Sequence, residues 1–225
     1  MAPEPRSYDM VPMTDLINRA ADVLEMHYGA KAQNDMRIPE ELMKEARGVA
    51  VLFNYQFSIG VTSSVGSGIL IAKKPGSEEW GCPIALGLGG VGVGLVIGAH
   101  KDETVLLLMS DAAVKTMCKA GLKCGADMQI ALGPTGVKED ANAILASREK
   151  PVDGYAYGKA VGLVMGGGFT TQVVSPMYDK NAAFYGVKSP SDGGPAADAL
   201  VLGDAPEGAA PSDAIGKLQG LLKVN

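Results

Sequence analysis

Three glycines, Gly87, Gly89 and Gly92, form a G-x-G-x-x-G pattern, the spacing that cradles the pyrophosphate of a dinucleotide. That chemistry needs a strand before the glycines and a helix after them, because the phosphates bind at the helix N-terminus. Residues 93–103 separate the glycines from the next strand-like run, and they hold two more glycines and three β-branched residues. A helix does not fit there, so the sequence argues against a nucleotide site.

Period-two alternation explains the same glycines better. Downstream, one parity holds Val91, Val93, Leu95 and Ile97 and the other holds Gly90, Gly92, Gly94 and Gly98. Upstream the parity is reversed, with Leu86 and Leu88 even and Gly87 and Gly89 odd. We expect the Gly89–Gly90 pair to absorb the switch as a bulge or tight bend. The pattern predicts a strand with a bare glycine face, which another backbone or a ligand could approach closely. The face comprises Gly87, Gly89, Gly90, Gly92 and Gly94.

Other residue types capable of catalysis give weak signals. His27 lies on the apolar stripe of a predicted helix and His100 beside Lys101 at a predicted turn, so both favour structural roles. The sequence contains neither a nucleophile elbow nor a phosphate-binding P-loop. Glu139-Asp140 is typical of a solvated turn, and Asp127, inside a strand-like run, favours a structural role. We predict no enzyme, no bound metal and no cofactor.

The three cysteines, Cys82, Cys118 and Cys124, show neither a disulfide framework nor a zinc-ligand spacing. Reduced thiols in the cytosol are the simpler interpretation. The N-terminal residues lack a signal-peptide pattern, and the longest apolar run, residues 84–99, is shorter than the roughly 20 residues of a membrane span. A formal net charge of -5 disfavours a nucleic-acid partner. These observations predict a soluble, cytoplasmic protein.

The elements that would hold these residues follow from periodicity and from turn residues. Helices are predicted over 12–28, from Pro39, over 110–119, over about 176–186 and after Ser212, with strand-like runs between Gly48 and Ser110 and again near 126–132 and 155–174. The strands are too closely spaced for repeated crossover helices. The sequence predicts an α+β fold: a curved, mostly antiparallel sheet, barrel-like or sandwich-like, with a few flanking helices.

Composition divides the chain into four segments. An N-terminal helical segment covers 1–37 and the body covers 38–187. Residues 188–211, rich in Gly, Pro, Ala and Asp, are expected to form an acidic flexible linker, followed by an amphipathic helix over 212–225. The sequence leaves open whether that last helix packs on the body or on another protein, and whether the chain forms oligomers.

An ordered series of short motifs resembles the SYLF domain family. In chain order they are IPEEL (38–42), ARGVAV (46–51), GSGILIA (66–72), Trp80 with Pro83, GLGGVG (87–92), IGA (97–99), GAD (125–127), GPTG (133–136), Tyr155, GKAVGL (158–163) and NAAFYG (181–186). The resemblance implies a binding module rather than an enzyme. Similar proteins bind phosphoinositides and other anionic lipids, are linked to actin assembly, and often carry a Src-homology-3 domain, for which this chain has no room. The chain departs from the family pattern at Thr62-Ser63-Ser64-Val65 and at Val96.

Charge limits where anionic lipid could bind. Residues 1–28 contain two basic and five acidic side chains, so the first helix is not expected to bind a membrane by charge. The candidate lipid ligands are therefore the lysines of the body: Lys73, Lys74, Lys115, Lys119 and Lys123. The leading hypothesis is a non-enzymatic module that binds anionic lipid and proteins, at a membrane surface and in connection with actin or trafficking. The alternative is a structural or assembly protein that works through protein contacts, with the N- or C-terminal helix as the contact.

Overall fold

The computed structural model describes residues 11–28, 37–123, 127–128, 130–132, 152–158, 169–206 and 212–223, and for 57–60, 93–100 and 169–171 it describes the backbone alone. The helices are α1 (Met13–His27), α2 (Glu40–Glu45), α3 (Asp111–Met117), α5 (Tyr178–Tyr185), η5 (Pro190–Asp192), α6 (Ala197–Leu202) and α7 (Asp213–Leu222). The strands are β1 (Gly48–Ala72), β2 (Ile84–Leu108), β3 (Leu122–Lys123), β4 (Ile130–Leu132), β5 (Gly154–Gly158) and β6 (Phe169–Pro176).

The sheet is built around one very long hairpin. β1 and β2, 25 residues each, pair antiparallel from Gly48 opposite Leu108 to Leu70 opposite Ile84. On its other side, β2 pairs with β6 along its first half and with β5 along its second half. β3 extends the sheet beyond β6, and β4 pairs with β5 in parallel. The described part of the sheet therefore has six strands, antiparallel except for one pair.

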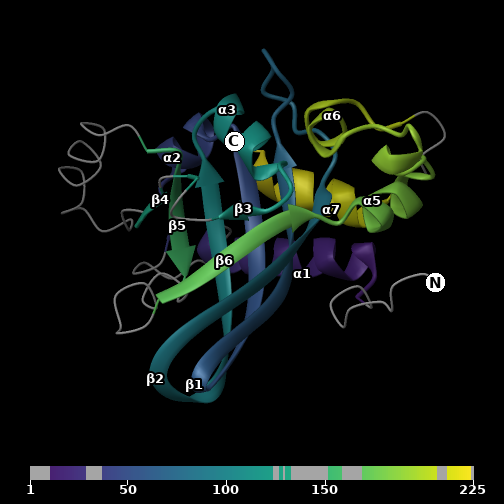
Figure 1. Cartoon of the computed structure of the whole chain (residues 1–225). Helices are drawn as coiled ribbons and strands as arrows, with labels where there is room; N and C mark the ends of the chain where they lie inside the picture. The colour runs from purple at the N-terminus through teal and green to yellow at the C-terminus, as the bar shows by residue number, and fades with distance from the viewer. Residues whose placement is uncertain are drawn as a thin grey trace.

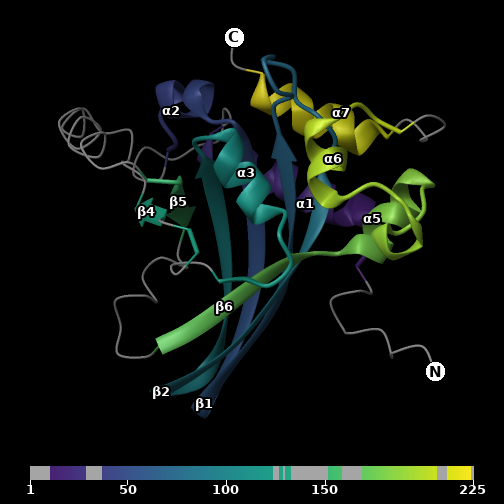
Figure 2. The same cartoon turned by 45° about the horizontal axis from the view of Figure 1, so that its top comes forward.

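The hairpin curls back on itself, so that the two halves of β1 come into contact (Figures 1 and 2). A Cβ atom added at Gly66 would lie 2.2 Å from the carbonyl oxygen of Phe53, and one added at Gly68 would lie 2.5 Å from that of Val51. Only glycine allows this approach of backbone to backbone. The result is a half-barrel with flanking helices, which confirms the predicted α+β class and the curved, mostly antiparallel sheet.

Two details of the strands differ from expectation. The separate strand-like runs merge into continuous strands, and His100–Glu103, read as a turn, lies within β2. The charged run fits a strand because successive side chains point to opposite faces of the sheet. Lys101 is exposed and pairs with Glu103 on one face, whereas Asp102 is buried on the other. The prediction of a bulge at Gly89–Gly90 is wrong, because the pairings of β2 with β1 and with β6 are both regular at these residues. The β1–β2 register shifts instead between Ile59 and Val61.

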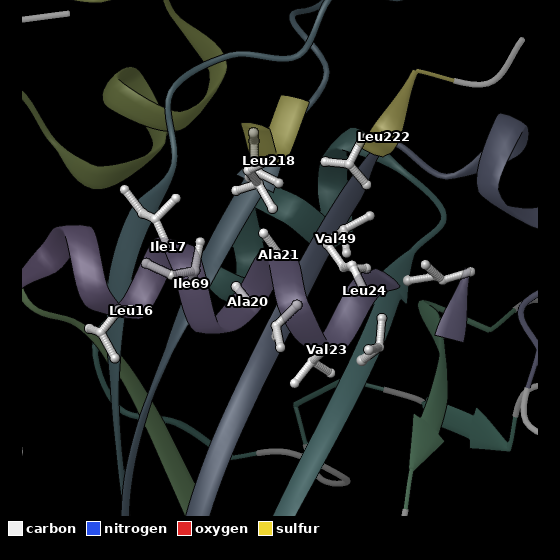
Figure 3. Packing of buried hydrophobic residues seen from close by; sticks show 14 of the residues in the cluster. Leu16, Ile17, Ala20, Ala21, Val23, Leu24, Val49, Ile69, Leu218 and Leu222 are labelled. Carbon is white, nitrogen blue, oxygen red and sulfur yellow. The ribbon is translucent and has the colours of Figure 1, made fainter. Parts of the chain in front are cut away.

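The two faces of the curled sheet bury two hydrophobic clusters. Odd-numbered residues of β1 and β2, such as Val49 and Ile69, pack under α1 and α7. Figure 3 shows α1 laying Leu16, Ala20 and Leu24 on this face. Even-numbered residues, such as Leu70 and Leu106, point inside the curl, where α3, α5 and α6 contribute further side chains. Because successive side chains of a strand point to opposite faces, the odd-numbered residues contribute to one cluster and the even-numbered residues to the other.

The last helix docks on the body. Leu218 and Leu222 of α7 are buried in the cluster under α1. The indole Nε1 of Trp80 donates to the carbonyl of Leu222 at 3.3 Å, and Gln219 Nε2 donates to the carbonyls of Trp80 and Gly81 at 3.1 and 3.0 Å. The segment before α7 is also more ordered than a flexible linker: Leu200 and Val201 of α6 are buried inside the curl. Of the predicted linker, 207–211 lie outside the described residues.

Asn181 of α5 fastens that helix to the start of β2. Its side chain accepts from the backbone N–H of Ala85 at 2.7 Å and donates to the carbonyl of the same residue at 3.1 Å. The amide therefore replaces a neighbouring strand at this position, and both residues are buried. Tyr185, one turn further along α5, donates to the carbonyl of Pro83, so the helix contacts the backbone twice at the strand's beginning.

Gly66 and Gly89 form a matched pair for testing the curl. Gly66→Ala places a methyl group against the Phe53 carbonyl, so we expect it to lower the free energy of unfolding by about 3 kcal/mol. A Cβ at Gly89 meets no atom within 4 Å, so Gly89→Ala is expected to change stability by no more than about 0.5 kcal/mol. Urea denaturation measures both, and equal losses would contradict a closed curl at Gly66.

Asn181→Ala removes both hydrogen bonds to Ala85 and leaves a buried N–H without its partner. We expect a loss of about 2–3 kcal/mol in the free energy of unfolding. Asp179→Ala, at an exposed position two residues earlier on α5, is the control and should cost less than about 1 kcal/mol. Thermal melts of both variants measure the contribution of these two hydrogen bonds. An unchanged melting temperature of Asn181→Ala would argue against that contribution.

Candidate functional site

The structure places three of the five candidate lysines along one exposed stretch, from α3 into β3. Ser110 caps α3, its Oγ accepting from the N–H of Ala113 at 3.0 Å, as its position before the helix predicts. Lys115 lies on α3, Lys119 lies two residues after the helix ends at Met117, and Lys123 lies on β3. All three side chains are exposed, and none forms an ion pair with a described residue. We refer to Lys115, Lys119 and Lys123 as the lysine row.

Lys73 and Lys74 have different surroundings. The Lys73 side chain is only 6% exposed, and its Nζ donates to the carbonyl of Lys44 at 2.7 Å and to Glu78. Lys74 pairs with Asp204 at 2.6 Å and with Glu79 at 3.1 Å. Hydrogen bonds to Asp204, and then to Glu79, raise the pKa of Lys74. The positive charge of this turn is therefore already matched by carboxylates of the same chain.

Arg47 organises the same turn. Its Nε donates to Asp111 at 2.9 Å, and its terminal nitrogens donate to the carbonyls of Lys74 and Ser77 at 2.9 and 3.2 Å. One guanidinium thus joins the turn after β1 to the first residue of α3, a use of its planar set of donors. The motif around Arg47 was visible in the sequence, but no local signal shows that its partners are backbone carbonyls about thirty residues away.

The glycines of β2 are distributed over both faces of the sheet. Because the ladder is regular between residues 86 and 93, Gly87 and Gly89 share the face of Val91, whereas Gly90 and Gly92 share the opposite one. Gly89 is exposed and its surroundings are open. Close approaches of backbone to backbone are found at Gly66 and Gly68 of β1, whereas Gly89 faces open space.

The other candidates have structural surroundings. His27 is buried at the end of α1, and Asp127, although exposed, accepts from the N–H of Lys123 at 2.8 Å and so closes a turn. Cys82 and Cys118 are buried free thiols, whereas Cys124 and the Glu139-Asp140 pair lie outside the described residues. Where the structure describes the chain, no three His, Cys, Asp or Glu side chains gather as a metal site would need. No helix of the described ranges has the length and apolar character for crossing a membrane.

A groove of about 920 Å³ lies between the connection after β1 and the C-terminal helices. Trp80, Cys82, Tyr185, Ile215 and Gln219 are among the residues that line it, and Lys74 lies at its side. Several lining side chains already hydrogen-bond within the protein, as described for Gln219 and Tyr185. Sequence reasoning missed this groove because its walls come from segments more than a hundred residues apart.

The fold and these surfaces define an α+β half-barrel module in which polar side chains such as Arg47, Asn181 and Gln219 join separate elements. Comparison with known proteins gives the family. The model of the Ysc84 family, described as Las17-binding protein actin regulator, matches residues 89–223, and the chain belongs to this family of SYLF domains.

Relatives in animals and yeast share the module. The chain is 31% identical over 171 residues to SH3 domain-containing YSC84-like protein 1 of Xenopus laevis and 31% identical over 170 residues to that of Homo sapiens. These matches cover 75% and 74% of this chain, and 50% and 48% of the relatives. LAS seventeen-binding protein 3 of Saccharomyces cerevisiae is 29% identical over 154 residues, covering 68% of this chain and 33% of that protein. The chain thus spans about half the length of the animal relatives; no solved structure matches it significantly.

The buried thiols lead to a test of how tightly the region around α3 and the groove is packed. Burial raises the pKa of Cys118 to about 12 and also raises that of Cys82. At pH 8 a thiol with a pKa of about 12 is ionised in about one molecule in ten thousand, and the thiolate is the reactive form. In a Cys124→Ser background we expect alkylation by iodoacetamide at pH 8 to be over about 100-fold slower in the native protein than in urea. Equally fast labelling would show that these thiols are accessible.

Proposed function

We propose that the chain is a non-enzymatic module that binds anionic lipid surfaces, phosphoinositides included, and protein partners connected with actin regulation. The observation that carries the lipid part is the lysine row: three exposed basic side chains without carboxylate partners among the described residues. In a protein of net charge -5, such a row is a local positive surface. This function implies a cytoplasmic protein that associates peripherally with membranes.

The protein-binding part is supported by the family description and by the names of relatives, which refer to binding of Las17 and to regulation of actin. The apolar faces of α1 and α7 are occupied, because both helices pack in the same cluster of the half-barrel. A partner of the docked helices would therefore contact their polar faces, where Lys217 pairs with Asp22 at 2.9 Å. An assembly role without lipid binding remains the alternative that the experiment below separates.

Neutralising the lysine row should weaken binding to anionic vesicles. A basic residue near an anionic surface contributes about 1 kcal/mol, so Lys115→Gln/Lys119→Gln/Lys123→Gln is expected to lose about 3 kcal/mol, or about 100-fold in partition coefficient. Co-sedimentation with phosphatidylcholine vesicles, with and without phosphatidylserine or phosphoinositide, measures this at low salt. Addition of salt should weaken the wild type more than the variant.

The control is Lys44→Gln/Lys101→Gln/Lys223→Gln, which changes the net charge equally at exposed positions elsewhere. It should bind nearly as well as the wild type. Equal losses in the two triple variants would mean that overall charge, not the lysine row, determines binding. If the wild type ignores anionic lipid even at low salt, the lipid function is wrong and the assembly alternative stands.

A further inference from the structure

The bent end of the β1–β2 hairpin belongs to a part of the sequence without charged side chains. Residues 54–72, 81–99 and 160–178 contain no Asp, Glu, Lys or Arg, although charged residues make up 20% of the chain. At that average, each of these stretches of 19 residues would carry about four. These three stretches include the bend of β1 and β2 and the whole of β6. Figures 1 and 2 show this bend beyond all the helices, at the end of the molecule opposite α3.

The polarity of the two faces is reversed near this bend. On the odd-numbered face, Val61 and Val91 are 63% and 72% exposed, the largest values among the exposed large apolar side chains described. They lie on neighbouring strands, since Val91 pairs with Ser63 and Val61 with Val93. On the even-numbered face, inside the curl, Asn54, Gln56 and Ser64 are only 4–6% exposed. A sheet that meets water on its outer face normally has apolar residues inside and polar residues outside.

The inner polar groups do not form a satisfied network that would explain the reversal. Both amide atoms of Asn54 and the hydroxyl of Ser64 are buried without a hydrogen-bond partner. The contact of Gly66 with Phe53 and Asn54 places the Ser64 end of β1 next to these residues. Buried polar atoms without hydrogen-bond partners are unfavourable. Exposed apolar residues and unpaired buried polar groups that occur at the same place in a fold are typical of functional regions. The outer valines therefore need an explanation other than stability in water.

The size of the exposed patch separates two classes of partner. The exposed Val61 and Val91 and the half-buried Val65 and Val173, with Ser63 and Gly89 between them, span three strands, and Lys123 of β3 pairs with Val173 at the edge. With strands about 4.8 Å apart and residues rising about 3.3 Å, the patch covers about 200 Å². A stable dimer needs about 800 Å² from each partner, so a second copy of the chain is not favoured. Shallow insertion into lipid needs only a few apolar side chains and, above all, the absence of charge.

We propose that the charge-free tip, meaning the outer face of the hairpin bend around Val61 and Val91, inserts into the apolar layer of a lipid surface. The inference shares the lipid surface with the proposed function but uses different residues. Lys123 pairs with Val173 at the edge of the patch, but Lys115 lies on α3, at the opposite end of the molecule from the tip (Figure 1). Insertion of the valines does not require the charge of the lysine row, and it should occur on neutral as well as anionic membranes. The ligand is thus the hydrocarbon of any fluid bilayer rather than a particular headgroup.

Val91→Trp reports insertion directly. The only native tryptophan, Trp80, is buried and provides a constant background. We expect phosphatidylcholine vesicles with brominated acyl chains to quench the emission of bound Val91→Trp by about half or more and to shift it to shorter wavelength. Met26→Trp, at a position on α1 that is 48% exposed, is the matched control and should not be quenched. Val61→Asp/Val91→Asp should reduce partition into the same vesicles at least about tenfold, without lowering the melting temperature.

Each outcome decides the matter. Quenching of Val91→Trp on neutral vesicles, retained when the lysine row is neutralised, supports insertion. Binding to anionic vesicles without quenching overturns the inference and leaves the proposed function intact. Failure to bind vesicles of either kind overturns both. If light scattering instead shows a dimer that Val61→Asp/Val91→Asp dissociates, the tip is an interface between copies and insertion is wrong.

Discussion

The close approach of one strand to itself is the constraint on which the structure depends. Gly66 and Gly68 bring the second half of β1 against the carbonyls of Phe53 and Val51, and no side chain fits between them. This contact turns a flat hairpin into a half-barrel with an inside and an outside. The ladder shifts by two residues near the bend, so each strand keeps its parity. A shift of one residue would have exchanged the face under α1 for the face inside the curl.

Local patterns in the sequence predicted five of the described helices, missed η5 and α6 within the expected linker, and predicted the sheet only in outline. α1, α2, α3 and α5 begin and end close to their expected positions, because periodicity and capping act over a few residues. The continuity of β1 and β2 could not be predicted, since it depends on partners up to about sixty residues away. Glycine shows the same limit. The glycine pattern in 87–94 was the more conspicuous, yet Gly89 faces open space and close contacts occur at Gly66 and Gly68, because a glycine's role depends on what lies opposite it.

The same difference between local and distant interactions separates the lysines whose surroundings could be predicted from those whose surroundings could not. Lys115 is exposed because it lies on the short capped helix α3, whose apolar side packs inside the curl, and Lys119 is exposed just after the end of that helix. The burial of Lys73 beneath the Lys44 carbonyl and the pairing of Lys74 with Asp204 involve distant segments that no local pattern brings together. The polar residues of the family motifs behave similarly. Asn181 and Arg47 bind backbone groups of other elements, so here a motif marks a joint of the fold rather than a ligand contact.

The central position of β2 also determines the order in which the chain can fold. Leu70 and Ile84 pair across a short connection, so the long hairpin can close progressively from there toward Gly48 and Leu108. β5 and β6 join the same strand much later in the sequence, as the pairing of Leu86 with Pro176 shows. Such non-local pairings make folding slow. A nascent chain therefore has both hairpin strands available long before the strands that cover the other edge of β2, and β2 is then exposed to pairing with other chains.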